Sequence, residues 1–157
     1  MAAFLLSVHV VAAVVFVGSV TVAVSLFPRY ARLALDETTA AAGVPGLHLL
    51  HRITRVYAVL ALAVPVFGLA VAAQLDVLGD AWVLVSMALT LLAGVLLAGV
   101  VLPGQRRLIE AVGSGAERPA DARALVRRLG MVSGVFNLVW VTVVVLMIVR
   151  PGSTTGV

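Results

Sequence analysis

Histidine is the residue type through which this chain could bind a metal ion or a cofactor, because the chain has three histidines and no cysteine. His9 stands inside an apolar stretch, with Ala12, Ala13 and Phe16 following on its helical face. An ionisable side chain inside such a stretch is a candidate functional residue, and a neutral imidazole binds haem iron, copper or zinc. The sequence therefore predicts a cofactor or metal ligand at His9. The alternative is that the ring only hydrogen-bonds a neighbouring helix or water.

Two methionines are the candidate partners of His9. Met87 lies seven residues after Asp80, and Met147 lies three residues before Arg150, so both are expected in the same leaflet as His9. Thioethers are soft ligands that suit haem iron or Cu(I). A site formed by His9, Met87 and Met147 is thus one prediction, while packing is the more ordinary role of methionine.

The composition places these residues in a membrane. Hydrophobic residues make up 62% of the 157, charged residues 11%, and the mean hydropathy is +1.18. Soluble domains have about 45–50% apolar and about 25% charged residues. Four charge-free stretches approach or exceed the ~20 residues that a membrane-spanning helix needs, and they lack the alternation of barrel strands. The predicted spans are 3–27, 56–73, 81–102 and 129–149.

The arginines predict the orientation of these spans. All eleven basic residues are arginine, and ten of them lie in or beside the first and third loops. The middle loop has none, and the tail has only Arg150. The positive-inside rule then places both long loops in the cytoplasm and both termini outside. We expect a multi-pass protein of the bacterial cytoplasmic (inner) membrane, and no nucleic-acid motif accompanies the net charge of +4.

The two halves of the chain resemble each other at an offset of 75 residues. Pro28 and Arg32 match Pro103 and Arg107, and Arg52 matches Arg127. We therefore predict an all-α, up-down four-helix transmembrane bundle made of two duplicated hairpins, 3–75 and 81–149. It forms one domain over 1–157, with a short tail at 150–157. The alternative is that any two such hairpins carry proline and arginine at their margins. Pro65 is expected to kink the second span.

A second group of candidate residues lies near the cytoplasmic ends of the spans. His9 is 19 residues, or roughly 28 Å of helix, from Pro28, so it cannot share a haem with His51. The group instead predicts snorkelling to anionic lipid headgroups, which fixes the orientation. The alternative is a site for an anionic ligand such as a propionate, a phosphate or a lipid headgroup. Its members are His48, His51, Arg52 and Arg55, with Arg123 and Arg127 as counterparts in the other half.

Other chemistries find little support in the sequence. The predicted spans contain no Asp or Glu, which counts against a carboxylate proton relay. No phosphate-binding glycine loop, zinc-protease motif or nucleophile elbow is present. We therefore predict no catalytic residue and lean against an enzyme. Asn137 is expected to form a hydrogen bond across helices.

The first span resembles a signature of several small bacterial membrane families. His9 is followed nine residues later by Gly18, and the span ends in Leu26-Phe27-Pro28-Arg29. This pattern is similar to copper-resistance D-type membrane domains, to uncharacterised four-span integral membrane proteins and, more loosely, to HemJ-type protoporphyrinogen oxidases. The HemJ resemblance implies haem ligation by His9, and the copper-resistance resemblance implies copper handling at the outer face.

Two functions from different classes remain open from the sequence. The first is a four-span inner-membrane protein that binds haem b or copper through His9. The second is a non-catalytic accessory or assembly subunit, which packs in a larger membrane complex or a homo-oligomer through its small-residue faces. Under both functions we expect anionic lipids to contact the cytoplasmic face of the protein.

Overall fold

A computed structural model describes residues 1–114 and 119–152 of the chain. Arg118 and the tail from residue 153, which the sequence analysis counted, lie outside the described residues. The described part is helical throughout, apart from short connections. Four helical stretches are long and apolar enough to cross a membrane, and they contain all four predicted spans: Ala2–Ala34, Ala40–Gln74, Ala81–Ser114 and Asp121–Val149.

Three of these stretches are built from more than one helical element. The first consists of α1 (Ala2–Ala12), the π-helical turn η1 (Ala13–Val17) and α2 (Gly18–Ala34). The second consists of α3 (Ala40–Leu60) and α4 (Ala63–Gln74), and the third of α5 (Ala81–Leu96), η2 (Leu97–Val101) and α6 (Leu102–Ser114). The fourth is the single helix α7 (Pro119–Val149).

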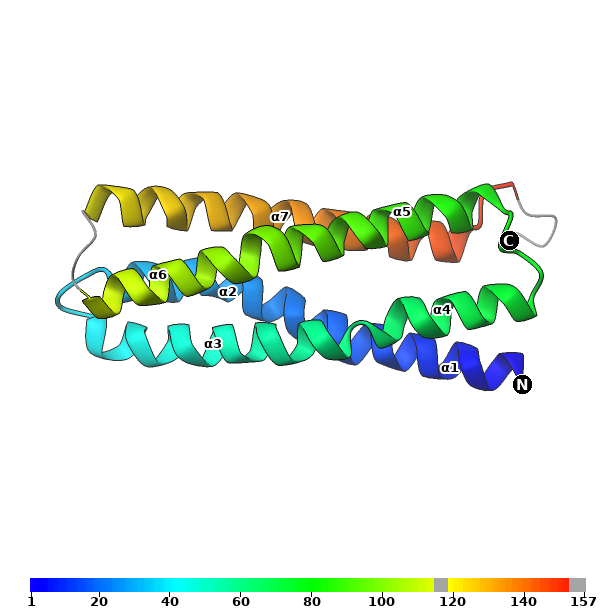
Figure 1. Cartoon of the computed structure of the whole chain (residues 1–157), viewed down its shortest axis with the longest axis horizontal. Helices are drawn as coiled ribbons and strands as arrows, with labels where there is room; N and C mark the ends of the chain where they lie inside the picture. The colour runs from blue at the N-terminus through cyan, green and yellow to red at the C-terminus, as the bar shows by residue number, and fades with distance from the viewer. Residues whose placement is uncertain (115–118, 153–157) are drawn as a thin grey trace.

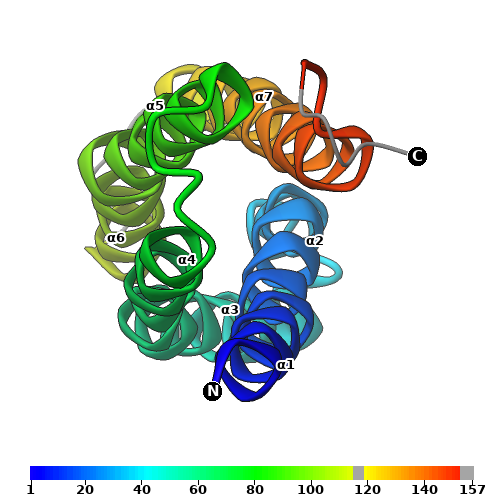
Figure 2. The same ribbon diagram turned by 90° about the vertical axis from the view of Figure 1, so that its right-hand side faces the viewer.

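The four stretches run up and down side by side, which confirms the predicted four-helix bundle (Figure 1). Within the first hairpin α1 packs on α4 and α2 on α3, and within the second hairpin α7 packs on α5 and α6. The hairpins meet where α2 packs on α7 and α3 on α6. Viewed from the end that carries the termini, α1 and α4 lie apart from α5 and α7 (Figure 2).

The second stretch is broken where the sequence predicts a kink. Pro65 has no N–H to donate to the carbonyl of Ala61, four residues earlier. That carbonyl instead accepts a tighter bond from the Val64 N–H at 3.0 Å, and the Leu62 N–H bonds to the Val59 carbonyl at 3.2 Å. The kink at Pro65 is thus confirmed as a break between α3 and α4.

The proposed duplication stays a prediction. The first and third stretches each contain a five-residue π-helical turn, but the two turns start at Ala13 and Leu97, which is not the offset of 75 residues. The second hairpin also has a continuous α7 where the first has the break between α3 and α4.

The core is densest toward the end of the bundle that carries the long loops, which we call the arginine-rich end. Phe27, Leu47, Leu108 and Leu129 are completely enclosed there. Elsewhere large aliphatic residues cover the outer faces of the helices; Leu91, for example, is exposed. In a bilayer these outer faces contact lipid chains, so their exposure carries none of the cost that it has in water.

Candidate site around His9

His9 is enclosed between α1 and α4. The residue is 7% exposed, and Nδ1 lies 2.8 Å from the carbonyl oxygen of Val64. Because a carbonyl oxygen can only accept, Nδ1 carries the proton and donates it, which leaves the lone pair of the neutral ring on Nε2. The contact of α1 with α4 thus fixes both the orientation and the tautomer of the imidazole.

A glycine on α4 makes room for this ring. A Cβ atom placed on Gly68 would lie 2.9 Å from Cε1 and 3.2 Å from Nδ1 of His9. Those distances are too short for non-bonded atoms, so any larger residue at this position would displace the imidazole. Val64, Pro65 and Gly68 fall within little more than one turn, directly after the break in the second stretch.

Nε2 of His9 has no hydrogen bond in the described part of the chain. The atom is not completely enclosed, although the residue as a whole is buried. A ring fixed through Nδ1, with an unpaired lone pair on Nε2, is the arrangement in which histidine binds metal ions.

The structure does not bring the two methionines to His9. Met87 is 40% exposed on α5, and Met147 is half-buried on α7. These two helices pack against each other, whereas α1 packs against α4 (Figure 2). Within the described residues no group of three or more His, Asp or Glu side chains could hold a metal ion. His9 is therefore the single imidazole at this place.

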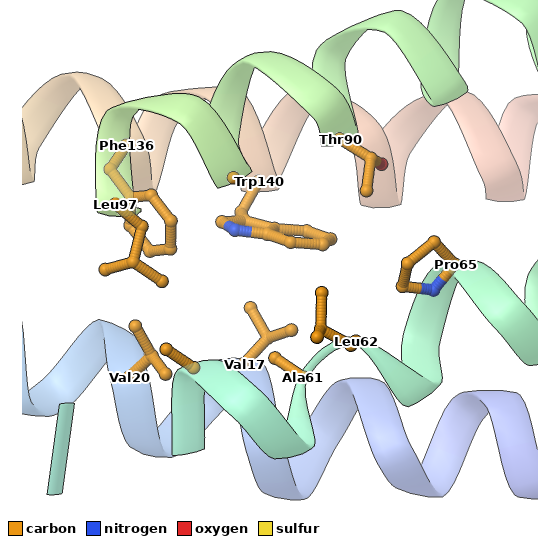
Figure 3. A pocket seen from close by; sticks show the side chains of 11 residues that line it. Val17, Val20, Ala61, Leu62, Pro65, Thr90, Leu97, Phe136 and Trp140 are labelled. Carbon is orange, nitrogen blue, oxygen red and sulfur yellow. The ribbon is translucent and has the colours of Figure 1, made fainter. Parts of the chain in front are cut away.

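A cavity of about 80 Å³ lies near the middle of the bundle, beyond the break in the second stretch (Figure 3). The Trp140 ring extends across it, with Leu62, Pro65 and Thr90 among the other lining residues. The indole Nε1 of Trp140 is enclosed without a hydrogen-bond partner. His9 does not line this cavity, which is smaller than the ~150 Å³ that accommodates benzene, so no porphyrin fits there.

The second site that the structure reveals joins α3 to α6 at the arginine-rich end. His51 Nδ1 lies 3.0 Å from Oε1 of Gln105, and Nε2 of Gln105 donates to Thr54 Oγ1 at 3.4 Å. Gln105 and Thr54 are almost completely buried. Gln105 could not be recognised from the sequence, because it precedes two arginines and so resembles an exposed residue at a helix end. Its offset from His51, 54 residues, gives no local signal.

The other members of the predicted anionic site are dispersed on the surface. His48, Arg52 and Arg55 are exposed on α3, and Arg123 is exposed on α7. Arg127 is also exposed, but it shares a groove with two other arginines that the prediction did not include. His51 differs from the rest, since it takes part in the hydrogen bonds to Gln105.

The predicted hydrogen bond of Asn137 across helices is confirmed. Its Nδ2 donates to Ser25 Oγ at 2.9 Å and so links α7 to α2. Its Oδ1 is enclosed without a partner.

Comparison with known proteins agrees with this membrane architecture. The chain matches the family described as "Predicted integral membrane protein (DUF2269)" over residues 3–151, which is nearly its whole length. No curated protein and no solved structure matches the chain. The resemblance to uncharacterised integral membrane proteins is thereby confirmed at the level of the family, and the chain belongs to the DUF2269 family of predicted integral membrane proteins.

Proposed function

We propose that this chain binds a metal-containing cofactor, haem b or a copper ion, through Nε2 of His9. The observation that carries the proposal is the hydrogen bond from Nδ1 to the Val64 carbonyl, which fixes the ring and leaves the Nε2 lone pair without a partner among the described residues. The first-span resemblance to the copper-resistance D-type and HemJ-type proteins agrees with this assignment.

One imidazole per chain is enough donors for haem, because a porphyrin supplies four nitrogen ligands itself. The cavity at Trp140 is too small for a porphyrin and is not lined by His9, so a haem held by His9 would lie outside it. Copper(I) would need further soft donors, for which Met87 and Met147 are the candidates, and these lie on α5 and α7, whose main contacts are with helices other than α1. When bound, either group would supply one-electron chemistry to a chain whose described spans provide no acid–base pair. We further propose that the chain lies in the bacterial inner membrane with both termini outside.

The test is to purify the full chain in detergent from bacteria grown with copper and with ample haem synthesis. We expect an absorbance band at about 400–430 nm for haem, or copper by elemental analysis, at up to one equivalent per chain. His9→Ala should lose it, whereas His48→Ala, which alters an exposed histidine on α3, should retain it. Size-exclusion profiles of the variants report on folding.

Two results would overturn the proposal. A colourless, metal-free preparation of the wild-type chain from such cells would remove it, and so would full retention of the cofactor by folded His9→Ala. If a colourless chain also co-purified with a larger membrane complex, the accessory-subunit function would take its place.

A further inference from the structure

We infer that a groove between α2 and α7 at the arginine-rich end binds the phosphate-bearing headgroup of an anionic phospholipid. Three arginines line this groove, Arg32 from α2 and the neighbours Arg127 and Arg128 from α7. The rest of its lining is small or apolar: Ala124, Val126, Gly130 and Met131. This site is independent of His9, which lies toward the other end of the bundle.

The groove exists because the two hairpins approach closely beside it. A Cβ atom on Gly130 would lie 3.8 Å from the Pro28 ring, so the proline packs directly on the glycine of the facing helix. Arg32 is one helical turn after Pro28, and Arg127 and Arg128 immediately precede the apolar part of α7. The close contact at Gly130 therefore positions guanidinium groups from both hairpins around one opening.

The charge in the groove is unbalanced. None of the three arginines has an ion pair or a hydrogen bond among the described residues, in contrast to Arg106, whose Nε lies 2.8 Å from Oε1 of Glu110. Three positive charges that line one groove repel each other unless an anion lies between them. Guanidinium groups bind phosphate oxygens through paired hydrogen bonds, which makes phosphate the matching anion.

An apolar face next to the groove favours a lipid over a free phosphate. Met131, Val135 and Leu138 follow one another at helical spacing on α7, and all three are exposed. This face leads from the arginines into the apolar stretch of the fourth span. A phospholipid would place its phosphate among the arginines and its acyl chains along this face, whereas inorganic phosphate would leave the face unused.

The experiment measures lipid binding by the full-length protein after removal of lipid in detergent. Phosphatidylglycerol and phosphatidylcholine with identical acyl chains are added separately, and binding is followed by native mass spectrometry and by the melting temperature. We expect tighter binding of phosphatidylglycerol. The triple variant R32Q/R127Q/R128Q should weaken that binding on the order of 100-fold, from about 1 kcal/mol per arginine.

A second triple variant, R52Q/R55Q/R106Q, is the matched control, because it removes the same charge from α3 and α6 outside the groove. It should retain most of the phosphatidylglycerol binding. Equal losses in the two triple variants would overturn the groove as a specific site, and so would equal binding of the two lipids by the wild-type protein. Inorganic phosphate should not reproduce the rise in melting temperature; if it does, the site binds free anions and the lipid assignment is wrong.

Discussion

His9 and His51 each use Nδ1 to reach an oxygen on another helix, but the two partners differ in kind. His9 donates to a backbone carbonyl within the first hairpin, and His51 is paired with the side-chain amide of Gln105 across the two hairpins. A backbone carbonyl is present whatever the residue, so a substitution at Val64 does not remove the partner of His9. The contact requires only that a glycine, here Gly68, lets the ring approach the helix. A side-chain partner must itself be satisfied, here by Thr54. The hydrogen bond of His9 fixes the orientation of one ring, whereas the hydrogen bond of His51 connects the two hairpins.

The largest effect is expected at the glycine under His9. Gly68→Leu would push the imidazole away from Val64, because even a Cβ atom there lies 2.9 Å from the ring. We expect a loss of about 1–3 kcal/mol in the free energy of unfolding, the usual cost of overpacking. The thermal melting temperature in detergent measures it, and under the proposed function the bound cofactor is lost as well.

Gly134→Leu is the control for this substitution. A Cβ atom on Gly134 meets nothing within 4 Å, so the variant should melt at or above the wild-type temperature, since leucine also favours the helix. Equal melting of the two leucine variants would show that His9 is not held as tightly as its contacts imply.

The next effect concerns the connection between the hairpins. Gln105→Leu keeps roughly the same volume but removes the acceptor for His51 and the donor to Thr54. Hydrogen bonds between membrane helices contribute about 0.6 kcal/mol on average and up to about 1.7 kcal/mol. We expect a loss within that range, measured by reversible unfolding in mixed micelles.

A double-mutant cycle separates this hydrogen bond from the other effects of the substitution. Combining Gln105→Leu with His51→Ala should cost less than the sum of the single changes, because both remove the same bond. Strict additivity would mean that His51 and Gln105 do not interact, and the contrast with His9 would disappear.

A smaller effect is expected at Asn137, the other polar side chain that links the hairpins. Asn137→Leu loses the hydrogen bond to Ser25, but it also removes an enclosed oxygen that has no partner. These two contributions oppose each other, so the net change should be smaller than for Gln105→Leu in the same unfolding assay. A larger loss would indicate that Asn137 Oδ1 has a partner in the membrane, such as a bound water.

The four spans and the kink at Pro65 could be predicted because both depend on local sequence. A charge-free run of membrane length is helical in any surroundings, and a proline removes one hydrogen bond wherever it stands. The contacts of His9 with Val64 and Gly68 could not be predicted. They depend on which helix lies beside α1, and any of the three other spans offers carbonyl oxygens and small residues.

For the same reason the sequence grouped the residues of the arginine-rich end differently from the structure. Spacing along one helix grouped His51 with His48, Arg52 and Arg55, because these four residues lie on one face of the predicted helix. In the structure the partner of His51 comes from α6, while Arg127 shares its groove with Arg32 of α2. Helical periodicity gives the face on which a side chain lies, but the neighbouring helix decides what it contacts.

The smallest effect tests how far the polar contacts of the arginine-rich end extend into its turns. Asp36, between α2 and α3, accepts hydrogen bonds at Oδ1 from the Thr38 hydroxyl at 2.5 Å and from the Thr38 N–H at 2.9 Å. These bonds, the hydroxyl first, hold the pKa of Asp36 below its ordinary 3.8, and the charge of Arg123 lowers it further. A lowered pKa stabilises the fold above the unfolded-state pKa, and this contribution is lost as the pH falls through the folded-state pKa.

Asp36→Asn should therefore melt slightly below the wild type near pH 7, and the difference should vanish in acid, once the wild-type carboxylate is protonated in both states. Melting curves in the same detergent at several pH values measure it. Glu37→Gln is the matched control, because Glu37 is an adjacent exposed carboxylate with no hydrogen bond or ion pair among the described residues. A difference that stayed constant with pH would mean that the amide perturbs the turn itself and that the carboxylate charge is not involved.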